Sequence, residues 1–344
     1  MESRFTFITS YETDYSRSGV LLSFLSKKGL VSEVIKFDSW RLLLSFAFNI
    51  FKANKHTDYY VIMNPSQFLT PIVRFLTFKR IILDSGWPLT EKSKTKNASI
   101  TLKIQRIKSW IIDFISMHLA NLVLLESEMQ KNRTSKRFKV AKHKIFVSLT
   151  GTEEESFANI SKHSGSPISY FKVGFRGKYT IEAGLEVLAE ATHLCSDPNI
   201  TFLVLASNIP PHIIFASNTI IENKPYSSKR EMAEMLETCN LLLGQLSDHP
   251  RLRVTIPHKA FEAAAMGKPY LTARAAGIQE FLVEGLEAEY FIPGDAADLL
   301  LHIQKLKKEN EYREMLGENI SQKYETMASE EAIGKNFLAL LRRD

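Results

Sequence analysis

Cysteine is scarce in this sequence: only Cys195 and Cys239 occur among its 344 residues. Two cysteines exclude both a disulfide framework and a zinc site built from cysteines. We expect both thiols to be reduced residues of the core. The sequence therefore has to be stabilised by ordinary packing rather than by cross-links.

Long hydrophobic runs are also missing. The longest near the N-terminus, "LLLSFAFNIF", lies between Arg41 and Lys52 and is far too short to span a bilayer. The opening residues "MESRFTFITSYETD" lack the basic-then-apolar order of a signal peptide. We expect a cytoplasmic protein that is either soluble or peripheral on the inner face of the plasma membrane.

Charge is unevenly distributed along the chain. Residues 1–150 contain 24 Lys and Arg against 11 Asp and Glu, a net charge of +13, whereas residues 151–344 carry a net charge of −7. This asymmetry suggests two domains with different partners. The basic half suits an anionic membrane or a phosphorylated ligand. No nucleic-acid-binding motif accompanies the charge, so we expect no nucleic-acid partner.

Short apolar runs alternate with helical patterns over the whole length, which is typical of parallel sheets covered by helices on both faces. The series occurs twice and predicts an α/β protein with two Rossmann-like domains. The polar stretch "SKHSGSPIS", residues 161–169, suits a linker between the two domains. The predicted strands are residues 4–10, 33–37, 59–63, 80–84 and 121–127 in the first half, and 169–175, 200–206, 218–224, 239–246 and 268–273 in the second.

Two basic helical segments in the first half, residues 39–56 and 101–120, combine Lys and Arg with large apolar side chains. One interpretation is that both are core helices with basic solvent faces. The other is attachment to an anionic membrane, in which aromatic side chains enter the interface and cations meet the headgroups.

The turn "VGFRGKYTIEAG", residues 173–184, follows a predicted strand and brings Arg176 and Lys178 among three glycines. Glycine permits close approach of a ligand to the backbone, and two cations can neutralise a diphosphate. A glycine-rich turn with solvated cations would look the same, so this pattern is weak by itself.

The stretch "IPHKAFEAAAMGKPYLTARAAGIQEFL", residues 256–282, is more specific. Pro257 begins a helix that holds Glu262, and Gly267 ends it before a strand. Small residues then precede a second helix, whose free amides suit a phosphate. A carboxylate beside such a site can accept hydrogen bonds from ribose hydroxyls, so the stretch predicts a nucleotide-sugar site.

The order "IPHKAFEAAAMGKPYLTARAAGIQEFLVEG…FIPGDAADLLLHIQKL" resembles the C-terminal signature of GT-B glycosyltransferases of glycosyltransferase family 4. "GVLLSFLSKKG", "LANLVLLESEMQKNR" and "FKVGFRGKYTIEAGLEVLAEA" are similar to other segments of that family. The resemblance implies the GT-B fold, with two Rossmann-like domains facing each other across a cleft. Their expected bounds are 1–162 for the basic acceptor domain and 168–328 for the donor domain, with a C-terminal helix at 329–344 returning to the first domain.

The resemblance also assigns residues to the donor site. It implies that Glu262 binds the donor ribose and that Arg176 or Lys178 contacts the phosphates. Lys259 matches a lysine of a "P-x-K-x-x-E" pattern. The remaining donor-binding positions are Gly19, which faces the diphosphate, and the segment of Gly277, Ile278, Gln279 and Glu280 around the distal phosphate.

Three positions depart from the family. Val254 stands where a sugar-contacting glutamate is common, Ala183 replaces a lysine, and Asp84 replaces a histidine after a first-half strand. His249 lies in the loop where the missing glutamate would be, so it could compensate. We predict Asp84 and His249 as the candidate catalytic residues.

The resulting prediction is a glycosyltransferase enzyme, expected to be a retaining and metal-independent hexosyltransferase. It would move a sugar from a nucleotide diphosphate sugar to a glycan, lipid-linked or otherwise anionic acceptor in surface polysaccharide or glycolipid synthesis. No cofactor is expected besides the donor substrate. Two alternatives stay open: a non-catalytic GT-B partner that binds nucleotide sugar or a membrane, and a nucleotide-sugar epimerase.

Overall fold

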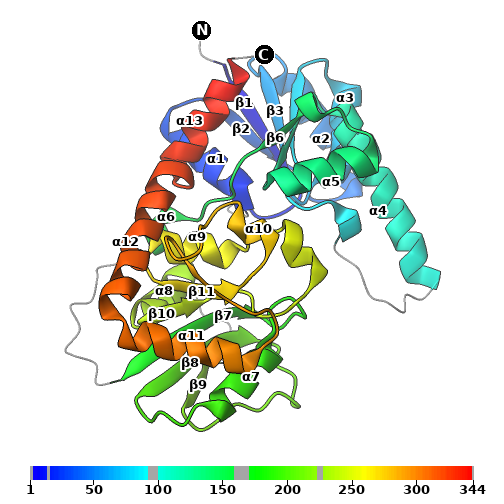
Figure 1. Ribbon diagram of the computed structural model, residues 1–344. Helices are drawn as coiled ribbons and strands as arrows, with labels where there is room; N and C mark the ends of the chain where they lie inside the picture. Colours follow the sequence, from blue (N-terminus) through cyan, green and yellow to red (C-terminus); the bar gives the residue numbers. More distant parts are fainter. Residues whose placement is uncertain (1–2, 14–15, 92–99, 159–169, 223–227, 343–344) are drawn as a thin grey trace. The chain divides into compact units, whose positions relative to one another are not determined.

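The computed structural model describes residues 3–13, 16–91, 100–158, 170–222 and 228–342. The chain divides into two compact units: unit 1 is Met1–Thr150 with Glu330–Asp344, and unit 2 is Gly151–Ser329. The linker predicted at 161–169 lies outside the described residues. Each unit contains one parallel six-stranded sheet with helices on its faces (Figure 1).

The sheet of unit 1 has the order β2-β1-β3-β4-β5-β6, and every neighbouring pair is parallel. Parallel neighbours require crossover connections, and helices provide them. The strands are β1 (Phe5–Thr9), β2 (Val31–Lys36), β3 (Tyr59–Ile62), β4 (Arg80–Asp84), β5 (Leu122–Leu125) and β6 (Ile145–Val147).

Apolar residues on the two faces of this sheet belong to two separate hydrophobic cores. Ile8, Tyr60 and Ile62 face one cluster, while Phe7 and Val61 face the other. The alternation follows from the two-residue period of a strand. The helices of unit 1 are α1 (Ser16–Lys27), α2 (Leu43–Ala53), α3 (Thr70–Leu76), α4 (Ile100–Leu119), α5 (Glu128–Phe138) and α13 (Glu330–Leu341).

The C-terminal helix α13 packs on α1 within unit 1. Phe337 joins the core beneath α1, and Ser23 Oγ donates to Glu330 Oε2 at 2.8 Å. Lys27 Nζ also lies 2.7 Å from Glu330 Oε1. The end of the chain is therefore part of the same compact unit as its beginning.

The sheet of unit 2 has the order β12-β11-β10-β7-β8-β9, again parallel throughout. Its longest pairing joins β7 and β8 from Phe171–Ile200 to Lys178–Ser207. The strands are β7 (Phe171–Lys178), β8 (Ile200–Ser207), β9 (Thr219–Glu222), β10 (Leu241–Leu243), β11 (Tyr270–Ala273) and β12 (Glu289–Phe291).

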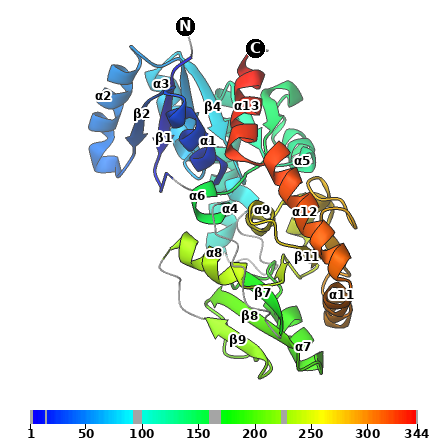
Figure 2. The ribbon, with the colours of Figure 1, turned by 90° about the vertical axis from the view of Figure 1, so that its left-hand side faces the viewer.

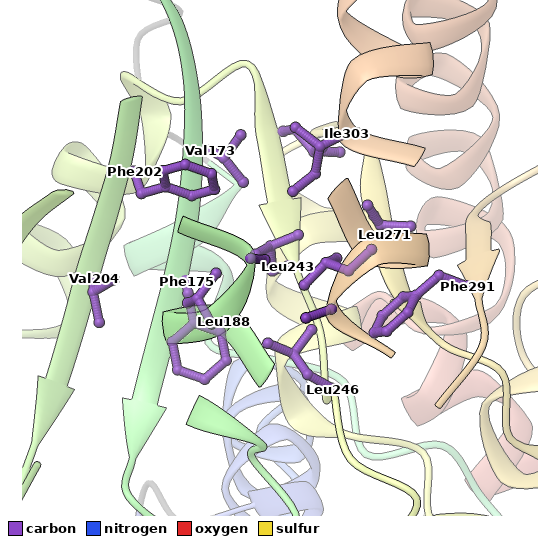
Figure 3. Packing of buried hydrophobic residues seen from close by; sticks show 14 of the residues in the cluster. Val173, Phe175, Leu188, Phe202, Val204, Leu243, Leu246, Leu271, Phe291 and Ile303 are labelled. Atoms are coloured by element: carbon purple, nitrogen blue, oxygen red, sulfur yellow. The ribbon is translucent and has the colours of Figure 1, made fainter. Parts of the chain in front are cut away.

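Helices of unit 2 cover both faces of that sheet (Figure 2). Figure 3 shows one core, in which Val173, Phe175 and Leu243 of the sheet pack with Leu188 of α7 and Ile303 of α11. The helices are α6 (Glu154–Phe157), α7 (Leu185–Leu194), α8 (Lys229–Glu237), α9 (His258–Ala265), α10 (Ala276–Gln279), α11 (Ala296–Lys308) and α12 (Asn310–Met327).

All ten predicted strands overlap strands of the structure, so the predicted pair of Rossmann-like α/β domains is confirmed. The strand prediction omitted β6 and β12, which lie at the edges of the two sheets and have three residues each. Strands this short give little periodic signal in the sequence.

The two basic segments form helices, as predicted. Residues 39–56 include α2, which buries Phe46, Ile50 and Ala53, and residues 101–120 form most of α4. No helix in the described part of the chain has the length and apolar character needed to cross a membrane.

Candidate functional site

The strand order of unit 2 creates a switch point between β7 and β10. The chain leaves β7 toward β8 and β9, and it later returns on the other side of β7 through β10, β11 and β12. In open α/β sheets, ligands bind outside the carboxyl ends of the strands at such a point. Arg176 and Lys178 occupy the end of β7, and Gly244 and Gln245 follow β10.

Helix α9 brings two charged side chains to the same point. It begins after Pro257, and its small residues Ala260, Ala263 and Ala264 are fully buried. This close packing also buries Lys259 and Glu262, which lie three residues apart and so share one side of the helix. The prediction that Glu262 stands in an early turn of a small-residue helix is confirmed.

Glu262 forms the centre of the arrangement. Arg176 donates from Nε and Nη2 to both of its carboxylate oxygens, and His258 Nδ1 lies 3.0 Å from Oε1. Burial alone would raise the pKa of Glu262, but the charge of Arg176 and the hydrogen bond with His258 outweigh burial and lower the pKa to about 2. The carboxylate is thus ionised, and its position is fixed by groups on two elements.

Lys259 is a buried amine at the same switch point, with 8% of its surface exposed. Its Nζ donates to Gly244 O at 3.2 Å and to Gln245 Oε1 at 3.3 Å, and it lies 3.7 Å from the ring centre of Phe175. Burial, reinforced by the nearby charge of Arg176, lowers the pKa of Lys259 well below its ordinary value. An anion placed here would favour the charged form of this amine.

Gly177 lies between the two cations of β7 and has φ of +153°. A Cβ at this position would lie 3.3 Å from Cε of Lys259, so a larger residue would crowd the amine as well as strain the backbone. Lys178, the next residue, is exposed at the end of the strand. The glycine-rich turn therefore lies beside Lys259, which shares one side of α9 with Glu262.

The loop after β10 holds a second charged cluster. His249 Nδ1 accepts from Arg251 N at 3.3 Å and lies 3.9 Å from Glu182 Oε1. Arg251 Nη1 donates to the same oxygen of Glu182 at 3.2 Å. Burial opposes ionisation of Glu182, but hydrogen bonds and the charge of Arg251 lower its pKa overall. Val254 lies in the same loop and is only 7% exposed. Because its side chain is aliphatic, this position supplies no carboxylate.

The segment from Gly277 to Glu280 packs against that loop. Gly277 fits closely, because a Cβ there would lie 2.4 Å from Thr255 O and 2.6 Å from Leu252 O. Ile278 is buried, whereas Gln279 and Glu280 are exposed. The structure thus gives Gly277 a packing role beside its predicted contact with the donor.

Asp84 lies at the end of β4 in unit 1 and has no exposed surface. It accepts from Ser18 Oγ at 2.6 Å and from Gly86 N at 3.1 Å, and Arg17 Nη2 lies 3.6 Å from it. These contacts hold the first turn of α1 against the sheet. Gly19, in the same turn, is partly exposed. Asp84 and Gly19 thus belong to unit 1, and the other predicted site residues belong to unit 2.

Three groups at the site escaped the sequence prediction: His258, Gln245 and Glu182. The first had a usable signal, because His258 stands four residues before Glu262 on a predicted helix, where side chains meet. No local signal pointed to Gln245 or Glu182. Their partners are 14 or more residues away in the chain, and only the tertiary fold brings them together.

No group of three or more His, Cys, Asp or Glu side chains within the described ranges is arranged to hold a metal ion. The switch point instead brings three basic side chains, those of Arg176, Lys178 and Lys259, to one carboxylate, that of Glu262. Such a set matches a ligand that carries phosphates and hydroxyl groups.

Comparison with known proteins gives one family match and several similar structures. Residues 188–335 match the family described as "Glycosyl transferase-like". Among curated proteins, no match is found. HepE of Anabaena, solved in complex with UDP-glucose, is similar to this chain with a TM-score of 0.70 and 13% identity, covering 99% of this chain and 100% of that one.

Two further solved structures are similar over the whole chain. Sucrose-phosphate synthase of Thermosynechococcus elongatus has a TM-score of 0.71 at 13% identity, with coverage of 99% and 98%. A glycosyltransferase of Rickettsia africae has a TM-score of 0.66 at 13% identity, with coverage of 100% and 99%. At such identities the likeness establishes the fold.

The fold is therefore GT-B, as predicted. Residues 188–335 match the glycosyl transferase-like family, and the predicted resemblance to the GT-B glycosyltransferases is confirmed.

The Glu262 ion pair should make the stability of the protein depend on acid pH. Because the pKa falls from 4.5 to about 2 on folding, the stabilisation is complete above 4.5 and is lost as the pH falls toward 2. The shift corresponds to about 3 kcal/mol at neutral pH. Urea unfolding of the wild type and Glu262→Gln should show this stability gap at about pH 7 and roughly half of it or less at about pH 3. A gap that does not change with pH would contradict the ion pair.

Proposed function

We propose that this protein transfers a sugar from a nucleotide diphosphate sugar to an acceptor hydroxyl. The observation that carries the proposal is the meeting of Arg176, Lys259 and Glu262 at the switch point of unit 2. The fold alone would not define this activity, because GT-B relatives and other α/β proteins share architecture but differ in their sites.

In the proposed complex, Glu262 accepts hydrogen bonds from the donor ribose. Arg176, Lys178 and Lys259 face the diphosphate, together with backbone amides around Gly277. As the bond between the anomeric carbon of the sugar and the diphosphate oxygen breaks, negative charge grows on the leaving diphosphate. Fixed cations stabilise that charge, which is the role of a metal ion in other transferases. Metal independence is thus part of the proposal.

The remaining roles are assigned by the same proposal. His249, held by Arg251 and close to Glu182, would contact the transferred sugar in place of the glutamate that Val254 replaces. Asp84 was predicted as a catalytic residue, but it has no exposed surface and is in contact with Ser18 and Arg17. These contacts support a positioning role through α1 and Gly19 in place of a catalytic one.

The acceptor would bind to the basic unit 1, and a glycan, lipid-linked or otherwise anionic molecule suits its charge. The family resemblance implies retention at the anomeric carbon. A hexose donor is part of the same proposal, and the basic charge of unit 1 fits a role in surface polysaccharide or glycolipid synthesis. A cytoplasmic location of the transfer is part of the same proposal.

A second candidate is a GT-B protein that binds nucleotide sugar without turning it over. Val254 favours this alternative, because a buried valine supplies no carboxylate to the transferred sugar. The neighbouring cluster of Glu182, His249 and Arg251 opposes it, because it brings charged groups to the same loop.

A panel of nucleotide sugars separates these possibilities. At a ligand concentration of about 100 times Kd, binding stabilises the folded state by about 2.7 kcal/mol and should raise Tm by several degrees. We expect at least one UDP-, GDP-, ADP- or TDP-sugar to do so, and the same donor to be hydrolysed slowly without acceptor. Binding without hydrolysis or transfer would favour the non-catalytic candidate. If no donor shifts Tm, the proposed site is wrong.

A further inference from the structure

Helices α2 and α3 of unit 1 leave an unusual set of side chains uncovered. We define the α2–α3 face by Leu44, Phe48 and Phe51 of α2, Phe75 of α3, and Phe78 just after α3. All five are exposed: Leu44 to 85%, Phe75 to 90% and Phe78 completely. The two helices pack on each other and lie side by side in both ribbon views (Figures 1 and 2).

The spacing within α2 shows that this exposure is organised. Phe46, Ile50 and Ala53 face the sheet and join its core, whereas Leu44, Phe48 and Phe51 recur at intervals of four and three on the other side. The helix is therefore apolar on two faces. A helix at the surface of a soluble domain normally presents polar residues outward. Single exposed leucines are ordinary, but four large apolar side chains on two adjacent helices, with a fifth directly after the second helix, mark an interaction surface.

Cations flank the residues of this face along the chain. From Trp40 to Arg80 the chain has six Lys and Arg and a single acidic residue, Asp58, a net charge of +5. Arg41 precedes α2, Lys52 and Lys55 lie at its end, and Lys79 and Arg80 follow Phe78. Apolar side chains bordered by cations fit a surface that is apolar inside and anionic outside.

We propose that the α2–α3 face docks onto the surface of an anionic lipid bilayer. Phe48, Phe51, Phe75 and Phe78 enter the boundary between headgroups and acyl chains, and the flanking cations meet lipid phosphates. The proposed mode of attachment is peripheral.

Trp40 adds a further element at the edge of this face. It lies in the short turn Trp40–Leu42 before α2, is 63% exposed and makes an edge contact with Phe37, with ring centres 5.1 Å apart. Indole rings favour the headgroup level of a bilayer, where one end is apolar and the other is hydrated. The docking surface thus has an aromatic rim as well as an apolar centre.

Vesicle flotation tests the proposal directly. The full chain should float with vesicles of mixed phosphatidylglycerol and phosphatidylcholine, and much less with pure phosphatidylcholine or at high salt. The double variant Phe75→Ser/Phe78→Ser should weaken partition into anionic vesicles by about tenfold or more. Lys52→Glu/Lys55→Glu should have an effect of about the same size. Since all four side chains are exposed, Tm should stay close to that of the wild type.

Unit 2 provides a matched control. Ile214→Ser/Leu301→Ser removes two apolar side chains that are more than half exposed outside the face, and it should float like the wild type. Equal loss in the control and in the Phe75/Phe78 variant would overturn the proposal, because the effect would then be general hydrophobicity. Flotation that ignores lipid charge would also overturn it. So would a concentration-dependent dimer that the Phe75/Phe78 variant abolishes while vesicle binding is unchanged, because the face would then join two copies.

Discussion

Replacing Glu262 with glutamine should weaken the binding of the donor nucleotide sugar by about 100-fold. Hydrogen bonds to a charged group contribute about 1.5–3 kcal/mol, and a ribose bound to the carboxylate loses that charge assistance. The amide also cannot accept from Arg176 on both of its atoms, so the orientation of this cation toward the diphosphate is lost as well. Isothermal titration with the donor identified by the panel measures the change in Kd.

Glu289→Gln is the matched control. Glu289 and Glu262 each have 5% of the side chain exposed, and each interacts with one histidine and one cation. Glu289 stands at the start of β12 rather than at the switch point. Its partners are His302 and Lys305 of α11 and the hydroxyl of Tyr312 in α12. Both variants should lose stability, but only Glu262→Gln should lose donor affinity. Equal affinities in the two variants would remove Glu262 from the donor site.

Much of the fold could be predicted because parallel strands buried on both faces appear as continuous apolar runs. Segments such as residues 80–84 and 200–206 show this clearly, and both coincide closely with β4 and β8. Strand order is a different matter. The position of β7 between β8 and β10 depends on crossover connections that the apolar runs alone do not specify.

The site could be predicted only in part. Glu262 and Lys259 lie on one helix, so their common side follows from helix geometry. Arg176 is 86 residues before Glu262, and its pairing with both carboxylate oxygens needs the register of β7 against α9. The sequence placed Asp84 at the end of a strand, as the structure does. It could not show that Arg17 and Ser18 enclose that carboxylate, because α1 reaches β4 only through the fold.

The exposure of the α2–α3 face could likewise not be predicted from the sequence. The composition of residues 39–56 fits a core helix as well as a membrane-facing one, and both interpretations stood. Only the packing of α2 on the sheet shows which side chains are used for the core and which are left outside. Phe75 and Phe78 illustrate the limit well: each would pass for a core residue in the sequence, and each is exposed.

Lys259→Met should reduce kcat/KM by about 100-fold without reducing the stability of the fold at neutral pH. Methionine fills similar space, so packing against Phe175 is kept and the cost of burying an amine disappears. The variant leaves Gly244 O and Gln245 Oε1 without this donor, which offsets part of that gain. Loss of one group that stabilises developing negative charge typically costs about 100-fold or more in rate. Transfer assays and urea unfolding of the same samples measure both effects.

The pH dependence of stability provides a second readout for Lys259. Its pKa is lowered on folding, so the unfolded chain binds more protons than the folded chain in the range below the ordinary pKa of 10.5. Stability of the wild type should therefore rise with pH toward that value, and the rise should be smaller in Lys259→Met.

Lys268→Met is the control. Lys268 donates to Glu237 O at 2.6 Å and pairs with the Glu237 side chain at 3.1 Å. This second variant should lose stability and keep kcat/KM. If Lys259→Met instead destabilises the protein and leaves kcat/KM unchanged, then the buried amine supports the fold of unit 2 and takes no part in holding the donor.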